Sequence, residues 1–170
     1  SQAGIRFDDN SDYKASTSPY VGLKYIYSPK TILSLTYSQA YLAPSPSYSY
    51  EHFGSFTGQQ DNQGRYLADT FRIPNPNLQP ETANAVELVI NQELNDHWQF
   101  ISTLYGSRLQ NLILFASPTV NPVSEFINGG WIKNTDHNVN LGESVAYGMD
   151  LSSRYRQQDY ELWGHYSFTD

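Results

Sequence analysis

The chain has 170 residues, of which 17 are acidic, 10 are basic and none is cysteine, giving a formal charge of −7. This length allows one domain or part of one, and the lack of cysteine excludes disulfide frameworks, thiolate metal sites and cysteine nucleophiles. Nucleic-acid affinity comes mainly from clustered Lys and Arg, so the acidic balance argues against a nucleic-acid partner. Neither a transmembrane helix nor a signal peptide is expected, because the chain lacks a long apolar run and a basic leader with an apolar core.

Seven segments alternate apolar and polar residues with a period of two, as strands with one apolar face do. In the clearest of them, Val145 and Met149 fall on one side, and Asp150 and Arg154 fall on the other. Several of these runs are longer than the usual globular strand, and no segment has a convincing helical pattern. In chain order, the expected strands cover residues 2–8, 19–27, 31–40, 82–94, 97–115, 142–156 and 160–169.

The connections between these strands are alternately long and short. They are a loop at 9–18, a turn at 28–30, a loop at 41–80, a turn at 95–96, a loop at 116–141 and a turn at 157–159. Outer-membrane barrels show this asymmetry, with short periplasmic turns and long outer loops. Strands of about 9–11 residues are long enough to cross the hydrocarbon layer at a tilt. The sequence therefore predicts an all-β, antiparallel up-and-down meander of about seven long strands that forms part of a transmembrane β-barrel.

Aromatic residues flank the three short turns. They are Tyr25, Tyr27, Trp98, Phe100, Tyr155 and Tyr160. In a barrel, they would form the girdle at the periplasmic interface, where rings with polar tips lie between lipid and water. The alternative is that they are ordinary strand residues over the core of a soluble sandwich.

Three segments resemble the barrel domain of TonB-dependent outer-membrane receptors. The first runs from GIRFDD at 4–9 to the aromatic-x-Ala-Pro box that ends at residue 44. The second is NPNLQPETANAVEL at 75–88, and the third is NLGESVAYGMDLSSRYR at 140–156. They follow the family's order and together cover nearly the whole chain. Departures at Leu42, Val89 and Asp150 affect the substrate class more than the family.

The resemblance implies a fragment of the C-terminal β-barrel domain, which has 22 strands around an N-terminal plug when complete. Seven strands would form only an open, curved sheet, so the plug, the TonB contact and the C-terminal strands would lie outside this chain. It also implies a receptor in the cell outer membrane, in contact with its lipid, that works with TonB through the plug. The solute would be scarce and large, such as an iron–siderophore, haem or cobalamin. No enzyme signature is present, and no catalytic residue, cofactor or metal site is expected.

Two groups of residues are the site candidates. His52 lies between the Ala-Pro and Asn-Pro-Asn-Leu boxes, in an arrangement that resembles haem-uptake receptors, although tyrosine-rich loops also suit aromatic siderophores. The candidate ligand-binding residues are Tyr48, Tyr50, His52 and Phe53. The residues expected to face the lumen and the plug are Glu87, Glu93, Asp150 and Arg154.

Two other functions remain open at this point. A soluble β-sandwich could bind glycans through exposed Tyr and Trp side chains. A simple porin would fit the long 41–80 loop but not the three matching segments.

Overall fold

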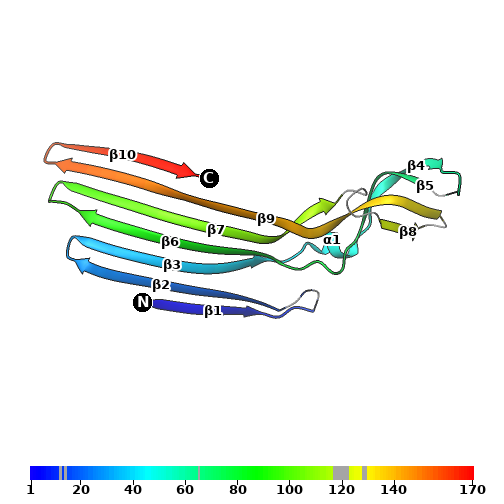
Figure 1. The fold of residues 1–170 in the computed structure, drawn as a ribbon, viewed down its shortest axis with the longest axis horizontal. Helices are drawn as coiled ribbons and strands as arrows, with labels where there is room; N and C mark the ends of the chain where they lie inside the picture. The colour runs from blue at the N-terminus through cyan, green and yellow to red at the C-terminus, as the bar shows by residue number, and fades with distance from the viewer. Residues whose placement is uncertain (12, 14, 65, 117–122, 128–129) are drawn as a thin grey trace.

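The computed structural model describes residues 1–170 except 12, 14, 65, 117–122 and 128–129 (Figure 1). In chain order, the elements are β1 (Gln2–Asp8), β2 (Ser16–Ser28), β3 (Thr31–Leu42), α1 (Pro46–Tyr50), β4 (Phe53–Gln60), β5 (Tyr66–Ile73), β6 (Glu81–Glu93), β7 (Trp98–Ala116), β8 (Val123–Ile127), β9 (Gly130–Gln157) and β10 (Tyr160–Thr169). Within these described ranges, no helix is long and apolar enough to cross a membrane.

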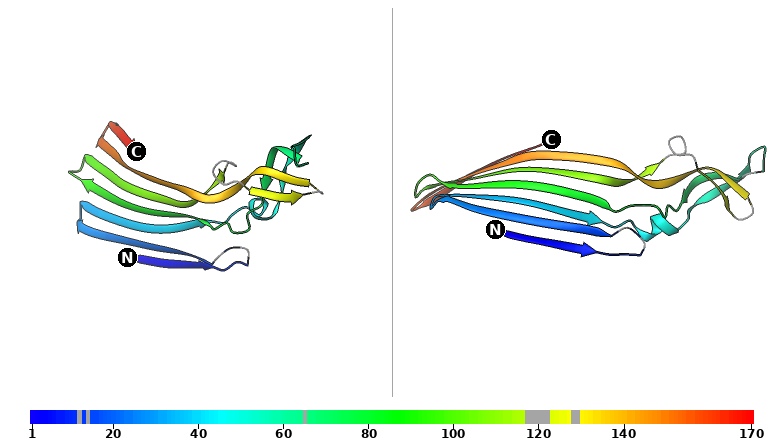
Figure 2. Two further views of the ribbon diagram at one scale, coloured as in Figure 1. Left: turned by 45° about the vertical axis from the view of Figure 1, so that its right-hand side comes forward. Right: turned by 60° about the horizontal axis from the view of Figure 1, so that its bottom comes forward.

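Seven strands form one antiparallel sheet. Their spatial order is β1, β2, β3, β6, β7, β9 and β10, and each strand is antiparallel to its neighbour. Figure 2 shows this sheet as a single bent layer, with the N-terminus on one edge strand and the C-terminus on the other. The prediction of an up-and-down meander is confirmed, and the barrel is not closed by these strands.

Register gives the sheet one apolar and one polar face. One row of cross-strand partners consists of Leu23, Leu35, Leu88, Leu104, Met149 and Phe168. The next row, which points to the opposite face, consists of Lys24, Ser34, Val89, Thr103, Asp150 and Ser167. We call these the apolar face and the polar face.

The apolar face is open to the surroundings. Leu104 lies in a central strand and is still 46% exposed, and Leu35 is also exposed. Over the described part of the chain, all strands belong to one sheet, and no second sheet covers this face. The structure is therefore not the β-sandwich that the glycan-binding alternative requires.

A second group of elements lies beyond the end of the sheet opposite the tight turns (Figure 1). This distal group contains α1, β4, β5, β8 and the first residues of β9. β4 and β5 are antiparallel, β5 runs parallel to β9, and β8 is antiparallel to β9.

The distal group corrects the expectation of irregular loops at 41–80 and 116–141. These segments contain α1, β4, β5 and β8, and β9 starts at Gly130 rather than at residue 142. β2 likewise starts at Ser16, inside the expected 9–18 loop. A strand that does not divide an apolar from a polar environment needs no period-two pattern, so periodicity does not reveal it. The parts of these loops at 12, 14, 65, 117–122 and 128–129 lie outside the described residues.

Burial is concentrated where the distal group meets the sheet. The buried residues there are Pro44, Ser49, Ile73, Leu78, Pro80, Ala116, Asn138 and Val139. Leu78 is only 2% exposed. The chain thus has a small core at this contact and not under the meander.

Two glycines on neighbouring strands give a matched test of the sheet. A Cβ at Gly148 would overlap the backbone oxygen of Phe168 and the ring of Tyr105, whereas a Cβ at Gly106 would lie 3.9 Å from Val86. Gly148→Val is expected to destabilise the intact receptor by about 1–3 kcal/mol, the usual cost of overpacking. Samples of the receptor are heated to a series of temperatures before electrophoresis. The measurement is the temperature at which the band of the folded form disappears. Gly106→Val is the control, and equal effects of the two variants would contradict this register.

Candidate functional site

An aromatic cluster marks the tight-turn end of the apolar face. The Trp98 ring centroid lies 5.7 Å from that of Phe100 and 4.8 Å from that of Tyr155, which is 5.9 Å from Tyr160. The turn beneath is fixed by the Asn95 side-chain oxygen, which accepts hydrogen bonds of 2.9 Å from two backbone amides, those of residues 97 and 98. The arrangement has the form of an interfacial aromatic girdle.

The apolar face ends at a second pair of tyrosines. Tyr37 and Tyr147 lie in one cross-strand row, with Val86 and Gly106 between them. Tyr147 precedes Tyr155 by eight positions in β9, and a rise of about 3.3 Å per residue separates the two aromatic rows by about 26 Å along the strand. At a strand tilt of about 35–45°, this length spans about 18–21 Å of height, somewhat less than the roughly 25 Å apolar band of a membrane barrel.

The polar face carries the four residues that were expected to face a lumen. The ladder places Glu87 opposite Tyr105, Glu93 opposite Gln99, and Gln99 opposite Arg154. Asp150 is on the same face, where Ser167 donates a hydrogen bond to its carboxylate. The structure thus brings Glu87, Glu93, Asp150 and Arg154 onto one face, spread over β6 and β9 and not gathered into a single cluster.

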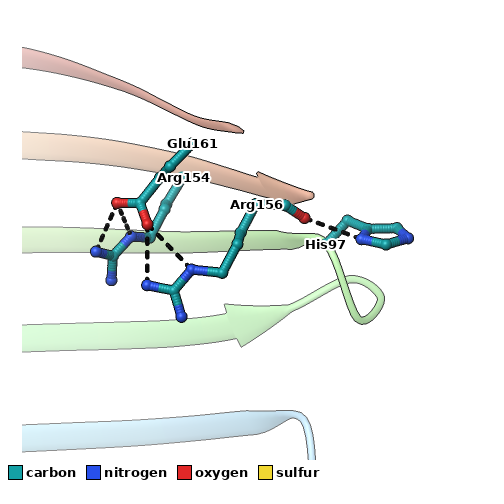
Figure 3. Close-up of polar contacts among 4 residues, drawn as sticks. All are labelled: His97, Arg154, Arg156 and Glu161. Atoms are coloured by element: carbon teal, nitrogen blue, oxygen red, sulfur yellow. Dashed lines mark hydrogen bonds and ion pairs between the residues drawn. The ribbon is translucent and has the colours of Figure 1, made fainter. Parts of the chain in front are cut away.

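Two arginines share one carboxylate near the tight turns (Figure 3). Glu161 Oε1 lies 2.7 Å from Arg154 Nη2, and Glu161 Oε2 lies 2.9 Å from Arg156 Nη2. His97 Nδ1 donates to the backbone oxygen of Arg156 at 2.9 Å. This cluster carries one net positive charge on the polar face. Glu161 was not among the candidates, although a two-residue turn places it directly opposite Arg156.

Ser152, His165 and Asp150 lie close together on the polar face, but they do not form a hydrolytic triad. Ser152 Oγ is 3.0 Å from His165 Nδ1, whereas His165 Nε2 is 3.8 Å from the Asp150 carboxylate. The second distance exceeds hydrogen-bond reach. In the part of the chain that is described, no three His, Asp or Glu side chains come together as a metal site.

The candidate ligand-binding residues lie in one continuous stretch of the distal group. Tyr48 and Tyr50 belong to α1, His52 follows the helix, and Phe53 opens β4. Tyr50 is 52% and Phe53 72% exposed, and His52 is also exposed. Tyr48 is half-buried. The stretch therefore exposes two aromatic rings and an imidazole, whereas Tyr48 is less exposed.

Arg72, at the end of β5, is a candidate that the sequence did not suggest. Its guanidinium carbon lies 5.4 Å from the centre of the Tyr48 ring and 4.6 Å from that of Phe115. Arg72 Nε is buried and has no hydrogen-bond partner among the residues that the structure describes. Arg72 is also the cross-strand partner of Phe53. A cation over two rings beside the aromatic stretch adds positive charge to this part of the distal group.

The NPNLQPE segment joins the distal group to the sheet. Asn75 N donates to Tyr48 O at 2.9 Å, and Asn75 Nδ2 donates to Asn138 O at 2.8 Å. Asn140 exchanges hydrogen bonds with the Gln79 backbone at 2.8 and 2.9 Å, and its Nδ2 also reaches the backbone oxygen of residue 111 at 2.7 Å. We call the contact between residues 74–80 and 138–140 the junction. It fixes the position of the ligand-binding candidates relative to the strands.

A single bent sheet with an apolar face between two aromatic rows, and a charged face behind it, has the form of a membrane β-barrel wall. Residues 2–170 match the family model described as "TonB dependent receptor-like, beta-barrel". The chain belongs to this family, as its resemblance implied.

Individual relatives agree with this assignment. Heme/hemopexin utilization protein C of Haemophilus influenzae is 25% identical, over 97% of this chain and 23% of its own length. Vitamin B12 transporter BtuB of Vibrio cholerae is 29% identical, over 71% of this chain and 16% of its own. A crystal structure of the ferric enterobactin receptor of Pseudomonas aeruginosa superposes with a TM-score of 0.76 at 19% identity, over 98% of this chain and 24% of that one. The chain thus spans less than a quarter of the curated relatives it matches.

Asn140→Ala tests the junction. Removing three hydrogen bonds and leaving their backbone partners unpaired is expected to cost about 2–3 kcal/mol of local stability. In the intact receptor, hydrogen exchange at the Asn75 and Leu78 amides should then accelerate by about 30-fold or more. The control is Asn91→Ala, which removes one hydrogen bond, from Gln99, at a distance from the junction. Unchanged exchange in Asn140→Ala would contradict this role.

Proposed function

We propose that this chain forms part of the wall of an outer-membrane receptor that imports a scarce, large solute. The observation that carries the proposal is the exposed apolar face bounded by two aromatic rows, which suits contact with lipid on one side of the sheet. Family membership supports a receptor or transporter. In this proposal, TonB acts through a plug domain outside this chain, and the chain itself performs no enzymatic reaction.

The tight turns would face the periplasm and the distal group the outside of the cell. The girdle at Trp98 and Tyr155 would then lie at the periplasmic interface, and the row of Tyr37 and Tyr147 at the outer one. The polar face, with Glu87, Glu93, Asp150 and Arg154, would point into the lumen. There it would meet the plug through ion pairs and water. The Glu161 cluster supports this assignment, because charged groups would be costly on a lipid-facing surface.

The solute would bind on the distal group at Tyr48, Tyr50, His52 and Phe53. The candidates are an iron–siderophore, haem and cobalamin. The names of two relatives refer to heme and to vitamin B12, and the superposed structure is a ferric enterobactin receptor. Arg72 favours an anionic solute within this set, because its charge lies over the Tyr48 ring and opposite Phe53.

Single cysteines test the orientation, since the chain has no native cysteine. Gln60→Cys in β4 is expected to react with a membrane-impermeant maleimide on intact cells. Asp159→Cys in the β9–β10 turn is expected to react only after the outer membrane is permeabilised. The measurement is the labelled fraction of the full-length receptor, with the receptor that lacks the introduced cysteine as background. Labelling of Asp159→Cys on intact cells would refute the proposed orientation.

Binding titrations with haem, a ferric siderophore and cyanocobalamin on the intact receptor test the solute class. Tyr50→Ala and His52→Ala are expected to weaken binding of the recognised solute by about tenfold each, because each removes an exposed contact group. Tyr160→Ala, at the opposite end of the sheet, is the control for loss of a tyrosine.

Arg72→Met separates charge from packing, because it keeps an unbranched side chain and removes the cation. It should weaken binding of an anionic solute and reduce the salt dependence of that binding. If none of the three compounds binds, or if the distal variants bind as tightly as the parent, this solute assignment fails.

A further inference from the structure

A hollow of about 500 Å³ lies on the polar face, at the tight-turn end of the sheet. Its lining comes from β7, β9 and β10 and includes Gln99, Ser152, Arg154, Trp163 and His165. The ladder pairs Arg154 with both Gln99 and Trp163, so these three residues form one row across the three strands. His165 is paired with Ser152 in the next row of the same face. The common register therefore brings these side chains together.

Trp163 is an unusual residue for this face. It lies in a row with Arg154 and Gln99, and it is 78% exposed. β10 is an edge strand, but a further strand paired with its free edge would lie beside Trp163 and would not cover a side chain that points out of the sheet. An indole combines a large flat apolar surface with one hydrogen-bond donor. The exposed ring thus suits an occupant that has a flat aromatic or macrocyclic face.

The charges beside Trp163 suit an anion. Glu161 is shared by Arg154 and Arg156, so this cluster carries one net positive charge (Figure 3). The side chains of the two arginines are still 49% and 63% exposed, respectively, so a ligand can reach them. A guanidinium matches the paired oxygens of a carboxylate or a similar anionic group.

The hollow has the same combination of groups as the distal ligand-binding candidates. Both places combine an exposed aromatic ring, an imidazole and an arginine, which in the hollow are Trp163, His165 and Arg154. The two places lie at opposite ends of the meander. A solute that enters at one end and leaves at the other would therefore meet similar chemistry twice.

We propose that this hollow is an exit site, where an anionic solute with a flat aromatic or macrocyclic face rests before it leaves the lumen. The solute would stack on Trp163 and place an anionic group on Arg154. This inference rests on the proposed function, because it requires the polar face to line the lumen and the tight turns to face the periplasm. The plug is proposed to share this lumen, so the solute reaches the exit site only while TonB pulls on the plug.

Photocrosslinking of the full-length receptor in intact cells tests the exit site. The photoreactive amino acid p-benzoylphenylalanine replaces Gln99, which lines the hollow, or Val89, which lies on the polar face outside it. Cells are illuminated while they take up radiolabelled haem or a radiolabelled aromatic ferric siderophore, and the label bound to the receptor is measured. The reporter at position 99 should capture label in cells that have TonB but not in cells that lack it. The reporter at position 89 should capture several-fold less.

Substitutions in the hollow should change the captured label in opposite directions. With the reporter at position 99, Trp163→Ala removes the stacking surface and Arg154→Gln removes a charge-assisted contact, and each should lower the captured label by about tenfold. Glu161→Gln removes the carboxylate that competes with the solute and should raise it. Tyr166→Ala is the matched control for loss of a ring, because Tyr166 lies on the same strand but on the apolar face. It should leave capture unchanged.

Three results would overturn the exit site. They are normal uptake without capture at position 99, capture at that position of a plug peptide alone, and lowered capture in Glu161→Gln, which a purely structural role of the cluster predicts. Equilibrium binding of the solute and its uptake by the parent keep the two proposals apart. Normal binding and uptake without capture reject only the exit site, whereas a parent receptor that neither binds nor imports solute rejects the proposed function.

Discussion

The shared register of seven antiparallel strands is the constraint on which the rest of the structure depends. Because side chains alternate between faces, one common register places Leu88, Leu104 and Met149 together and sends Asp150 to the other side. A slip of one residue in any strand would exchange the side chains of its two faces, and in β9 it would place Asp150 among these leucines. A single layer has no protein partner for its apolar face, so the environment has to supply one. Membrane contact thus follows from the pairing pattern and not from overall hydrophobicity, and the mean hydropathy is −0.55.

The second organising feature is the junction, where the chain packs like a soluble protein. Leu78 is buried and Asn138 is 4% exposed, and backbone groups that have left the sheet ladder are paired by Asn75 and Asn140. Prolines in the NPNLQPE segment restrict the backbone before the chain enters β6. The wall needs lipid to cover it, whereas the distal group is held by ordinary burial and hydrogen bonding. The amino-acid sequence of the distal group can therefore change without changing the strands that form the wall.

Sequence patterns predicted the meander strands, which have an apolar and a polar face, but missed the distal strands, which do not alternate in this way. The meander strands were predictable because one face is apolar along their length. β4, β5 and the start of β9 carry no such pattern, so they were taken as loop. The grouping of Tyr50 and His52 follows from their closeness in sequence. Arg72 was missed because Tyr48 and Phe115, which it contacts, are far from it in the sequence. The pairing of Arg156 with Glu161 could have been predicted, because the position of a hairpin turn determines which residues face each other.

β9 is a continuous strand of 28 residues that belongs to both parts of the molecule. One end carries Arg154 and the shared carboxylate cluster, and the other end pairs with β5 beside Ile73. A paired strand resists bending more than a loop does, so β9 connects the sheet to the distal group more rigidly than a loop would. A change in its tilt within the wall would swing the whole distal group, without any rearrangement inside that group.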